Sequence, residues 1–386
     1  MFPGNENAVQ SLWELLSDLE DPRDNRGKRH DLREIIVLIV IGFLLGKTDY
    51  VNIAHCLRLK MEELRKYLCL RNGIPSHDTF SNVTKALDSK QLIYIICAWF
   101  CQLVDIHGKH LVIDGKGILA AAEKNRNKKT PYIMNVLEAA SKMVLMQLKV
   151  GEKTNEITGI DELLDYIDVD DSVVTIDAIG TQKEIMNKII KKKGHFVLPV
   201  KENQHNLCSD ITLFLDDVIK SNDLCVQKLS ESITNDHGRE EKRIYYSTND
   251  ISCIFDDGFK MIKTVGKVVR ERTYYIYDDE GKVVDKKSTV DETIYVSDLV
   301  MDVKMMSRYI RNHWTIENSL HWVLDNTFRE DRSTNKKGNS MENTALLRKV
   351  AYNIIRLHQS KQTNCSFEYI IDEFAYNIST IMSYVF

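Results

Sequence analysis

The chain has 386 residues, of which 43% are hydrophobic and only 5 are proline, and its formal charge is −4 from 52 Lys and Arg against 56 Asp and Glu. This composition excludes a disordered chain, a collagen-like repeat and a small disulfide-stabilised scaffold. At about 100 to 200 residues per domain, the length predicts two or three domains with enough apolar material for a sizeable core. The near-neutral charge argues against a generally basic nucleic-acid coat but leaves room for local basic patches.

The cysteines and the apolar segments indicate the compartment. The 8 cysteines form no CxxC pair, which is typical of reduced thiols in a cytosol. The N-terminal sequence lacks a basic start followed by an apolar block, so we expect no secretory signal. The longest apolar run, residues 35–45, has about half of the roughly 20 residues that a membrane helix needs. We therefore expect a cytoplasmic protein without a membrane contact, in which this run is a buried helix.

The periodicity of apolar residues predicts the order of the elements. Residues 1–105 show helical spacing and predict an all-α module. Residues 106–225 begin with three β-rich runs and continue with alternating helices and strands, which is typical of an α/β sheet with crossover helices. Residues 226–300 return to β-type alternation, and residues 301–386 are strongly helical.

Two of the predicted α/β strands end in the same way. One runs into Asp114 and Gly115, and another runs into Asp177 and Ala178. Such an Asp lies at the carboxyl edge of the sheet, where ligands bind in α/β folds. If the strands are neighbours, the two carboxylates converge and need a cation or a shared proton. Oxygen ligands alone suit Mg²⁺ or Mn²⁺ better than zinc.

A third carboxylate, Glu317, lies within the late helical region. It shares one predicted helical face with apolar residues, so a partner such as a bound metal would offset the cost of its burial. Neighbouring large side chains are expected to pack the helix against the sheet. The residues of the face are Met306, Ile310, His313, Glu317, Leu320 and Leu324, and the packing residues are Trp314, Ile316 and Trp322.

Each carboxylate also has a structural interpretation. An Asp at a strand end is commonly a turn former, and Glu317 is an exposed residue if a turn changes the phase of the helix. The three together favour a ribonuclease-H-like fold, which carries Asp on its first and fourth strands and an acidic residue on a later helix. In such a site two metal ions about 4 Å apart activate a water or a 3′-hydroxyl for phosphodiester transfer.

Long motifs in the same order extend this interpretation to nearly the whole chain. They are DPRDNRGKRHDLREI and GIPSHDTFSNV in the N-terminal module, then IDGKG at Asp114, EKTNEI from Glu152, TIDAIGTQK at Asp177, LPVKENQ ending at Gln204, HGREEKR from His237 and RNHWTIENSLHWVLDNTFRED around Glu317. On these motifs the chain resembles bacterial insertion-sequence transposases of the DDE class, of the H-repeat-associated type.

The resemblance implies a fold, a site and a cofactor. The fold is a ribonuclease-H-like α/β core with a β-rich insertion, preceded by an all-α module that binds DNA ends. The catalytic triad is Asp114, Asp177 and Glu317, which would bind two ions of Mg²⁺ or Mn²⁺, with Asp114 bridging both.

The sequence departs from one signature of related transposases, an Arg four positions before the catalytic Glu and a Lys seven positions after it. His313 and Leu324 stand at those positions, and Tyr309 and Arg311 lie out of register. The hairpin-forming chemistry associated with that signature is therefore not carried over to this chain, and whether a hairpin intermediate is used stays open. We expect His313 or Arg311 to contact a DNA phosphate instead.

Further polar residues are candidates for DNA contacts. Lys201, Asn203 and Gln204 of the LPVKENQ motif are interpreted as a phosphate-binding segment. Arg239 would extend the basic surface in the insertion, and Arg29 belongs to a basic cluster that would contact DNA ends. The remaining charged residues of the motifs are interpreted as neighbours of the metal ligands or as structural residues, with surface ion pairing as the safer assumption for most of them: Glu152, Glu156, His321, Asp325, Glu330 and Asp331.

These observations predict a transposase that cuts and joins DNA. Its partners would be double-stranded DNA, as terminal inverted repeats and as target, and a second copy of the chain in a homodimer. It would associate with the bacterial nucleoid when bound. Two alternatives stay open: a nuclease or resolvase on the same fold without strand transfer, and a non-catalytic, host-adopted DNA-binding remnant.

Overall fold

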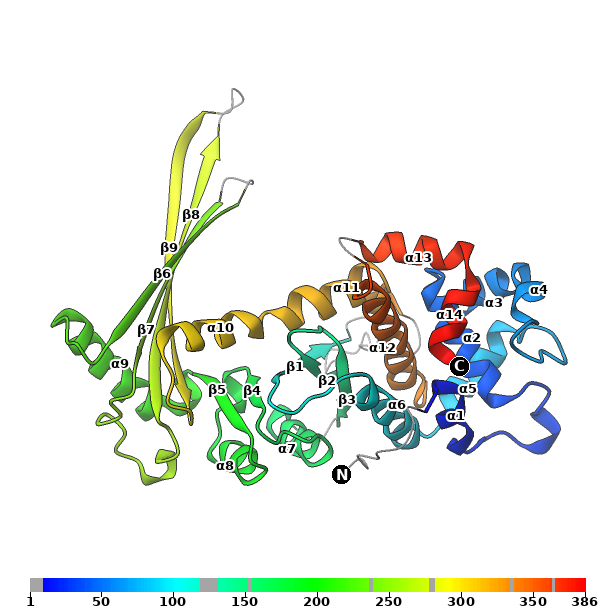
Figure 1. Ribbon diagram of the computed structural model, residues 1–386, viewed down its shortest axis with the longest axis horizontal. Coiled ribbons are helices and arrows are strands. Elements are labelled where there is room, and N and C mark those ends of the chain that lie inside the picture. The colour runs from blue at the N-terminus through cyan, green and yellow to red at the C-terminus, as the bar shows by residue number, and fades with distance from the viewer. Residues whose placement is uncertain are drawn as a thin grey trace. The chain divides into compact units, whose positions relative to one another are not determined.

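The computed structural model describes residues 10–118, 131–151, 155–235, 239–277, 282–333, 337–362 and 365–386 (Figure 1). The chain divides into two compact units, which are described in turn. Unit 1 comprises Met1–Ile106, Asp114–Ile167 and Thr315–Phe386, and unit 2 comprises His107–Ile113 and Asp168–Trp314. Among the described residues, no helix is both long enough and apolar enough to cross a membrane.

The N-terminal part of unit 1 is helical, as its periodicity predicts. Asp31, Asp49, Ser76 and Asp88 each cap a helix by accepting hydrogen bonds from backbone N–H groups of its first turn. The apolar run at residues 35–45 forms most of a helix that is buried on nearly all sides. The elements are α1 (Leu12–Leu15), η1 (Leu16–Asp18), η2 (Asn25–Gly27), α2 (Leu32–Leu44), α3 (Tyr50–Leu59), α4 (Met61–Leu64), α5 (His77–Ala86) and α6 (Ser89–Leu103).

The rest of unit 1 packs around one long buried helix, α12 (Ser340–Gln359). This helix contacts α2, α5, α6, β3 and α13 (Figure 1). Strands β2 and β3 form an antiparallel pair, and α7 packs against both. Their bounds are β2 (Tyr132–Glu138), β3 (Val144–Val150), α7 (Glu156–Tyr166), α13 (Phe367–Tyr376) and α14 (Ile378–Val385).

Strand β1 (His110–Gly117) belongs to both units, because the boundary falls between Ile113 and Asp114. In unit 2 its first half pairs in parallel with β4 (Val173–Ile176), which pairs in parallel with β5 (His195–Val200). Helix α8 (Lys183–Lys191) is the crossover between these two strands and packs against β5.

The insertion in unit 2 adds four antiparallel strands after α9 (His205–Lys220). Strand β9 pairs with β5 and continues the sheet through β8, β7 and β6. The first part of β9, residues 283–292, is exposed, and its last part, residues 293–297, is buried. In Figure 1 the long strands β8 and β9 extend well beyond α10. The bounds are β6 (Gln227–Asn235), β7 (Arg239–Thr248), η6 (Asp257–Phe259), β8 (Thr264–Tyr277), β9 (Val283–Ser297) and α10 (Val303–His313).

Helix α10 closes the core of unit 2. Its apolar face packs over β4, β5, β6 and β7. The buried cluster under it includes Val197, Tyr245, Tyr295, Met306 and Ile310. Because α10 covers the carboxyl ends of the core strands, its last residues lie next to the end of β4.

The strand order confirms the predicted fold class. It reads β3-β2-β1 in unit 1 and β1-β4-β5-β9-β8-β7-β6 in unit 2. Three strands with antiparallel β2 and β3, followed by parallel β4 and β5, are the arrangement of a ribonuclease-H-like core. The β-rich insertion follows this core, and the all-α module precedes it.

The late helical region differs from the expected continuous helix. Helix α10 ends at His313, and a π-helical turn, η7, spans Glu317–His321 before α11 (Trp322–Asn326) and η8 (Glu330–Arg332). A π-turn changes the phase of the following residues. Of the expected packing residues, Ile316 is buried, whereas Trp322, which follows the turn, is 56% exposed, so the prediction is wrong for Trp322. Trp314, which precedes the turn, is 50% exposed, and its ring lies 5.9 Å from the guanidinium of Arg270 on β8.

Candidate active site

In unit 1, the end of β1 and the π-turn η7 bring two carboxylates and an imidazole together. Nδ1 of His321 lies 2.8 Å from Oε2 of Glu317 and 3.7 Å from Oδ2 of Asp114. One ligand atom from each residue lies within 4.8 Å of the others. The His321 side chain is only 5% exposed, whereas that of Glu317 is 58% exposed. Glu317 therefore faces solvent, as in the alternative that a turn changes the phase of the helix.

The local sequence explains the position of Asp114. Its Oδ1 atom accepts a hydrogen bond from the backbone N–H of Gly115 at 2.8 Å. A Cβ atom at position 115 would overlap the ring of Tyr132 on β2. Gly115 is therefore required for the close approach of Tyr132 beside the carboxylate, which gives the IDGKG motif a steric reason.

Lys116, two positions after Asp114, ties β1 to the segment that follows Glu317. Its Nζ atom lies 2.7 Å from Asp325, 3.0 Å from Asp331 and 3.8 Å from Glu330. Burial opposes the charge of Lys116, but the three acids raise the pKa of its ammonium. Glu330 is 1% exposed and also faces Arg348 at 3.9 Å. Glu330 is therefore a buried structural residue, whereas the side chains of Asp325 and Asp331 are 34% and 29% exposed.

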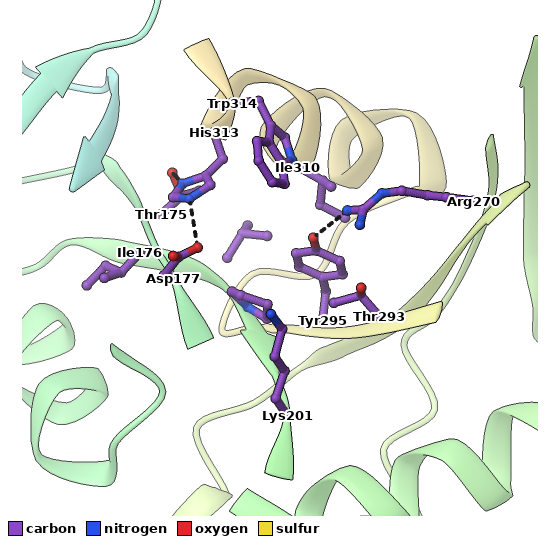
Figure 2. Close-up of a pocket in the computed structure, with 12 residues that line it drawn as sticks. Thr175, Ile176, Asp177, Lys201, Arg270, Thr293, Tyr295, Ile310, His313 and Trp314 are labelled. Carbon is purple, nitrogen blue, oxygen red and sulfur yellow. Dashed lines mark hydrogen bonds and ion pairs between the residues drawn. The ribbon is translucent and has the colours of Figure 1, made fainter. Parts of the chain in front are cut away.

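In unit 2, Asp177 follows the last residue of β4 and faces the end of α10 (Figure 2). Oδ1 of Asp177 lies 3.4 Å from Nε2 of His313. The hydrogen bond from His313 lowers the pKa of the Asp177 carboxyl, with a smaller contribution from the charge of Lys201. Asp177 is therefore held as a carboxylate.

The second ring nitrogen of His313 contacts a buried chain of polar groups. Nδ1 of His313 lies 3.1 Å from Oγ1 of Thr175, which lies 2.9 Å from Nε2 of His110. Burial lowers the pKa of His110 to about 3, so this imidazole is neutral. The ring of Tyr309 packs edge-on against His110. The His313 ring is thus fixed by its neighbours within unit 2.

Asp177, His313 and Thr175 line a cavity of about 140 Å³. Lys201 and Arg270 contribute positive charge to its wall, and Arg270 is itself hydrogen-bonded to Asp291 and to the hydroxyl of Tyr295. Figure 2 shows Trp314 and Ile310 on the helix side of the cavity and Tyr295 on the strand side. The lining residues are Thr175, Ile176, Asp177, Val197, Pro199, Lys201, Arg270, Thr293, Tyr295, Ile310, His313 and Trp314.

Asn203 and Gln204 hold the loop that follows Asp177. The amide of Asn203 donates to the carbonyl of Ala178 at 2.7 Å, and the amide of Gln204 donates to the carbonyl of Thr181 at 3.0 Å. These donors are engaged within the protein, so the LPVKENQ motif has a structural role beside any contact with DNA. Lys201 is exposed and lines the cavity beside Asp177.

The remaining predicted DNA contacts lie apart from this cavity. Arg311 lines a shallow groove with Lys304 and Arg308, and its guanidinium lies 2.9 Å from Glu231. Arg29 is exposed, and its carbonyl accepts a hydrogen bond from Asn72. The side chain of Arg239 lies outside the described residues, as do Glu152 and His237.

The structure therefore brings Asp114 and Glu317 together within unit 1, while Asp177 belongs to unit 2. The convergence of all three carboxylates stays a prediction. Sequence reasoning left His321 open between a neighbour of the metal ligands, a structural residue and a surface ion-pairing residue; the structure buries it beside both carboxylates. Its position four residues after Glu317 was the available signal, because such residues share a helical face.

Comparison with known proteins identifies the family of the chain. Residues 107–354 match the family model described as "Transposase DDE domain", and residues 13–100 match the model described as "DDE_Tnp_1-associated". A relative named "Putative transposase YncI" from Escherichia coli O157:H7 is 32% identical over 90% of this chain and 88% of its own length. "H repeat-associated putative transposase YhhI" from Escherichia coli K12 is 28% identical over 90% of each chain.

A solved structure of a piggyBac transposase synaptic complex with hairpin DNA also matches. The alignment covers 96% of this chain and 78% of that chain, with 12% identity and a TM-score of 0.43. This likeness is too distant to assign a fold or a ligand.

Proposed function

Because this chain belongs to the DDE transposase family, we propose that it binds the terminal inverted repeats of an insertion sequence and catalyses metal-dependent DNA cleavage and strand transfer. The observation that carries the proposal is the pairing of Asp114 with Glu317 in unit 1. The first carboxylate lies in the second half of core strand β1, and the second stands on the late helical segment.

The donor atoms suit the implied metal. Asp114 and Glu317 offer carboxylate oxygens, the ligands that Mg²⁺ and Mn²⁺ prefer. In the proposal, Asp177 would supply the third carboxylate for the metal. When bound, the ions supply Lewis acidity for the phosphodiester and lower the pKa of the attacking water or 3′-hydroxyl.

The residues of unit 2 prepare Asp177 for this role. His313 holds its carboxyl ionised, and Asn203 fixes the loop behind it. Lys201 places a positive charge on the same cavity wall, where it would bind a phosphate of the DNA backbone. Preorganised groups of this kind need no rearrangement when negative charge develops during the reaction.

Contacts away from the cavity would supply most of the DNA affinity. We infer that Arg311, with Lys304 and Arg308, binds backbone phosphates along the groove of α10. Arg29, and Arg239 of the insertion, would add further phosphate contacts, with residues 1–105 as the module that binds DNA ends. His313 is already engaged with Asp177, so in this proposal it acts through that carboxylate.

The reaction joins two DNA ends to a target, so we propose that a homodimer assembles on paired terminal inverted repeats. Its DNA substrate would place the protein at the nucleoid of a bacterial cytoplasm. The residues 106–225 and 301–386 would form the catalytic core around the insertion at 226–300.

The proposal is tested with purified full-length protein, Mg²⁺ or Mn²⁺, and labelled DNA that carries the inverted repeats flanking the gene. We expect cleavage at the repeat ends and joined products, and neither with scrambled ends or with the Asp177→Asn variant. Cleavage that ignores the repeat sequence and gives no joined product would show a general nuclease instead. Binding without cleavage would show a DNA-binding remnant.

A further inference from the structure

His321 is the buried member of the cluster that also contains Asp114 and Glu317. We propose that Nδ1 of His321 is a direct ligand of the metal ion that these two carboxylates bind, which makes this half of the site a mixed nitrogen and oxygen centre. The proposal deepens the proposed function and rests on it. It concerns unit 1 alone, because all three residues belong to that unit.

The distances fit a shared ion. Neighbouring ligands of an octahedral ion, each roughly 2.1 Å from it, are roughly 3 Å apart. Nδ1 of His321 lies 2.8 Å from Oε2 of Glu317 and 3.7 Å from Oδ2 of Asp114. The Glu317 side chain is 58% exposed, so solvent and not packing surrounds much of it and its carboxylate can rotate towards an ion. The imidazole itself is held in place by burial.

The backbone places Nδ1 in this position. Glu317 and His321 are the first and last residues of the π-turn η7. Such turns are uncommon and occur frequently at functional sites. The turn is supported from α12, because the guanidinium of Arg356 donates a hydrogen bond to the carbonyl of Ser319 at 3.1 Å. The orientation of His321 is therefore built into the fold before any ion binds.

The other ring nitrogen leaves Nδ1 available. Nε2 of His321 is buried and, among the described residues, has no hydrogen-bond partner. The tautomer of a histidine is set by the hydrogen bond that its other nitrogen makes. Without an ion, the carboxylate of Glu317 at 2.8 Å favours a ring proton on Nδ1. When an ion binds, that proton moves to Nε2, which has no partner among the described residues, and Nδ1 offers its lone pair to the ion.

A nitrogen ligand changes which ion the site prefers. Imidazole binds Mn²⁺ more readily than Mg²⁺, which favours oxygen ligands and keeps its waters. The chain should therefore bind Mn²⁺ more tightly than Mg²⁺, and this preference should shrink when His321 is replaced. If His321 does not bind the ion and only donates a hydrogen bond that orients Glu317, replacing it should leave the preference for Mn²⁺ over Mg²⁺ unchanged.

The experiment uses the full chain with Mn²⁺ as the probe. Electron spin echo modulation of the bound ion detects a directly coordinated nitrogen. The first variant is His321→Asn, because the asparagine amide can still donate to Glu317 but offers no imidazole. The matched control is His358→Asn. His358 is also buried, but it faces a single carboxylate, that of Glu373 at 3.2 Å, whereas His321 faces two.

We expect a nitrogen coupling in the wild-type protein and in His358→Asn, and its loss in His321→Asn. The Mn²⁺ affinity of His321→Asn should fall by at least about tenfold, since even outer partners of a metal ligand contribute that much. Labelling the wild-type protein with ¹⁵N-histidine should convert the coupling to that of ¹⁵N, which tests the ligand without any substitution.

Other outcomes would overturn the inference. They are the absence of nitrogen coupling in the wild-type protein, or an unchanged coupling and affinity in His321→Asn. The variants Asp114→Asn and Glu317→Gln show whether only the ligand role of His321 is wrong or the proposed function as well. If both variants keep full Mn²⁺ binding and cleavage, the proposed function fails. If both lose them while the wild type shows no coupling, only the role of His321 fails.

Discussion

His313, the last residue of α10, lies with its Nε2 atom 3.4 Å from Oδ1 of Asp177 at the end of β4. The two residues are far apart in the sequence, and α10 brings them together within unit 2. The imidazole stabilises the ionised carboxyl, and the buried Thr175 and His110 fix the ring from behind. The state of Asp177 therefore depends on where α10 ends.

Replacing His313 with Ala should raise the pKa of the Asp177 carboxyl towards its ordinary value of 3.8. A depressed carboxyl pKa stabilises the fold above that ordinary value, and the stabilisation is lost as the pH falls through the folded pKa. The wild type and the variant should therefore converge in stability at lower pH. Titration of ¹³C-labelled aspartate by NMR, without metal, measures the pKa. His195→Ala is the control, since His195 pairs with Asp298 instead, and an unchanged Asp177 pKa in His313→Ala would contradict the assignment.

Replacing Asn203 with Ala should slow cleavage while leaving DNA affinity nearly unchanged. The lost hydrogen bond to the carbonyl of Ala178 frees the loop that follows Asp177, and a displaced catalytic group costs roughly ten- to a hundredfold in rate. Lys201→Met is the matched comparison, because it should weaken binding through a lost phosphate contact. Single-turnover rates and fluorescence anisotropy separate the two effects. A variant Asn203→Ala that loses affinity at an unchanged rate would show a direct DNA contact instead.

Replacing Lys116 with Met should destabilise the protein by about 3 kcal/mol, because it removes the cation shared by Asp325, Asp331 and the buried Glu330 and leaves Glu330 facing Arg348 at 3.9 Å. The control is Lys183→Met, which breaks an exposed pair with Asp256 at 2.6 Å and should cost less than about 1 kcal/mol. Urea unfolding followed by circular dichroism measures both. Equal midpoints for the two variants would contradict a structural role of the Lys116 network.

Replacing Glu231 with Gln should strengthen DNA binding, because it frees the guanidinium of Arg311 from its ion pair. Arg311→Gln should weaken binding and lower the salt dependence by about one phosphate contact. Affinities over a series of salt concentrations test both changes. If neither variant changes the affinity, the groove beside α10 does not contact DNA.

The sequence predicts most of the elements because their signals are local. The apolar run at residues 35–45 becomes the buried part of α2, and the strand runs before Asp114 and Asp177 become β1 and β4. A strand end followed by a small residue is visible without knowing what packs against it. Asp177 follows the last residue of β4, as the pattern indicates, whereas β1 continues past Asp114 to Gly117, so the expected strand end at Asp114 is wrong.

The features that sequence reasoning missed depend on tertiary packing. The π-turn at Glu317 follows no residue pattern and is held partly by Arg356 of α12. It explains why Trp322 is exposed instead of packed. Likewise, the buried partners of Lys116 and the hydrogen bond of Asn203 join segments whose approach only the fold reveals.

The proposed metal-dependent cleavage requires Asp114, Asp177 and Glu317 to act together. The most direct measurement is the Mg²⁺-dependent cleavage rate of inverted-repeat DNA for Asp114→Asn, Asp177→Asn, Glu317→Gln and the double variant Asp114→Asn/Asp177→Asn. Groups that act as a unit are strongly non-additive, so each single variant should lose nearly all activity and the double variant should be no worse. A single variant that cleaves at the wild-type rate, with DNA binding intact, would contradict the triad.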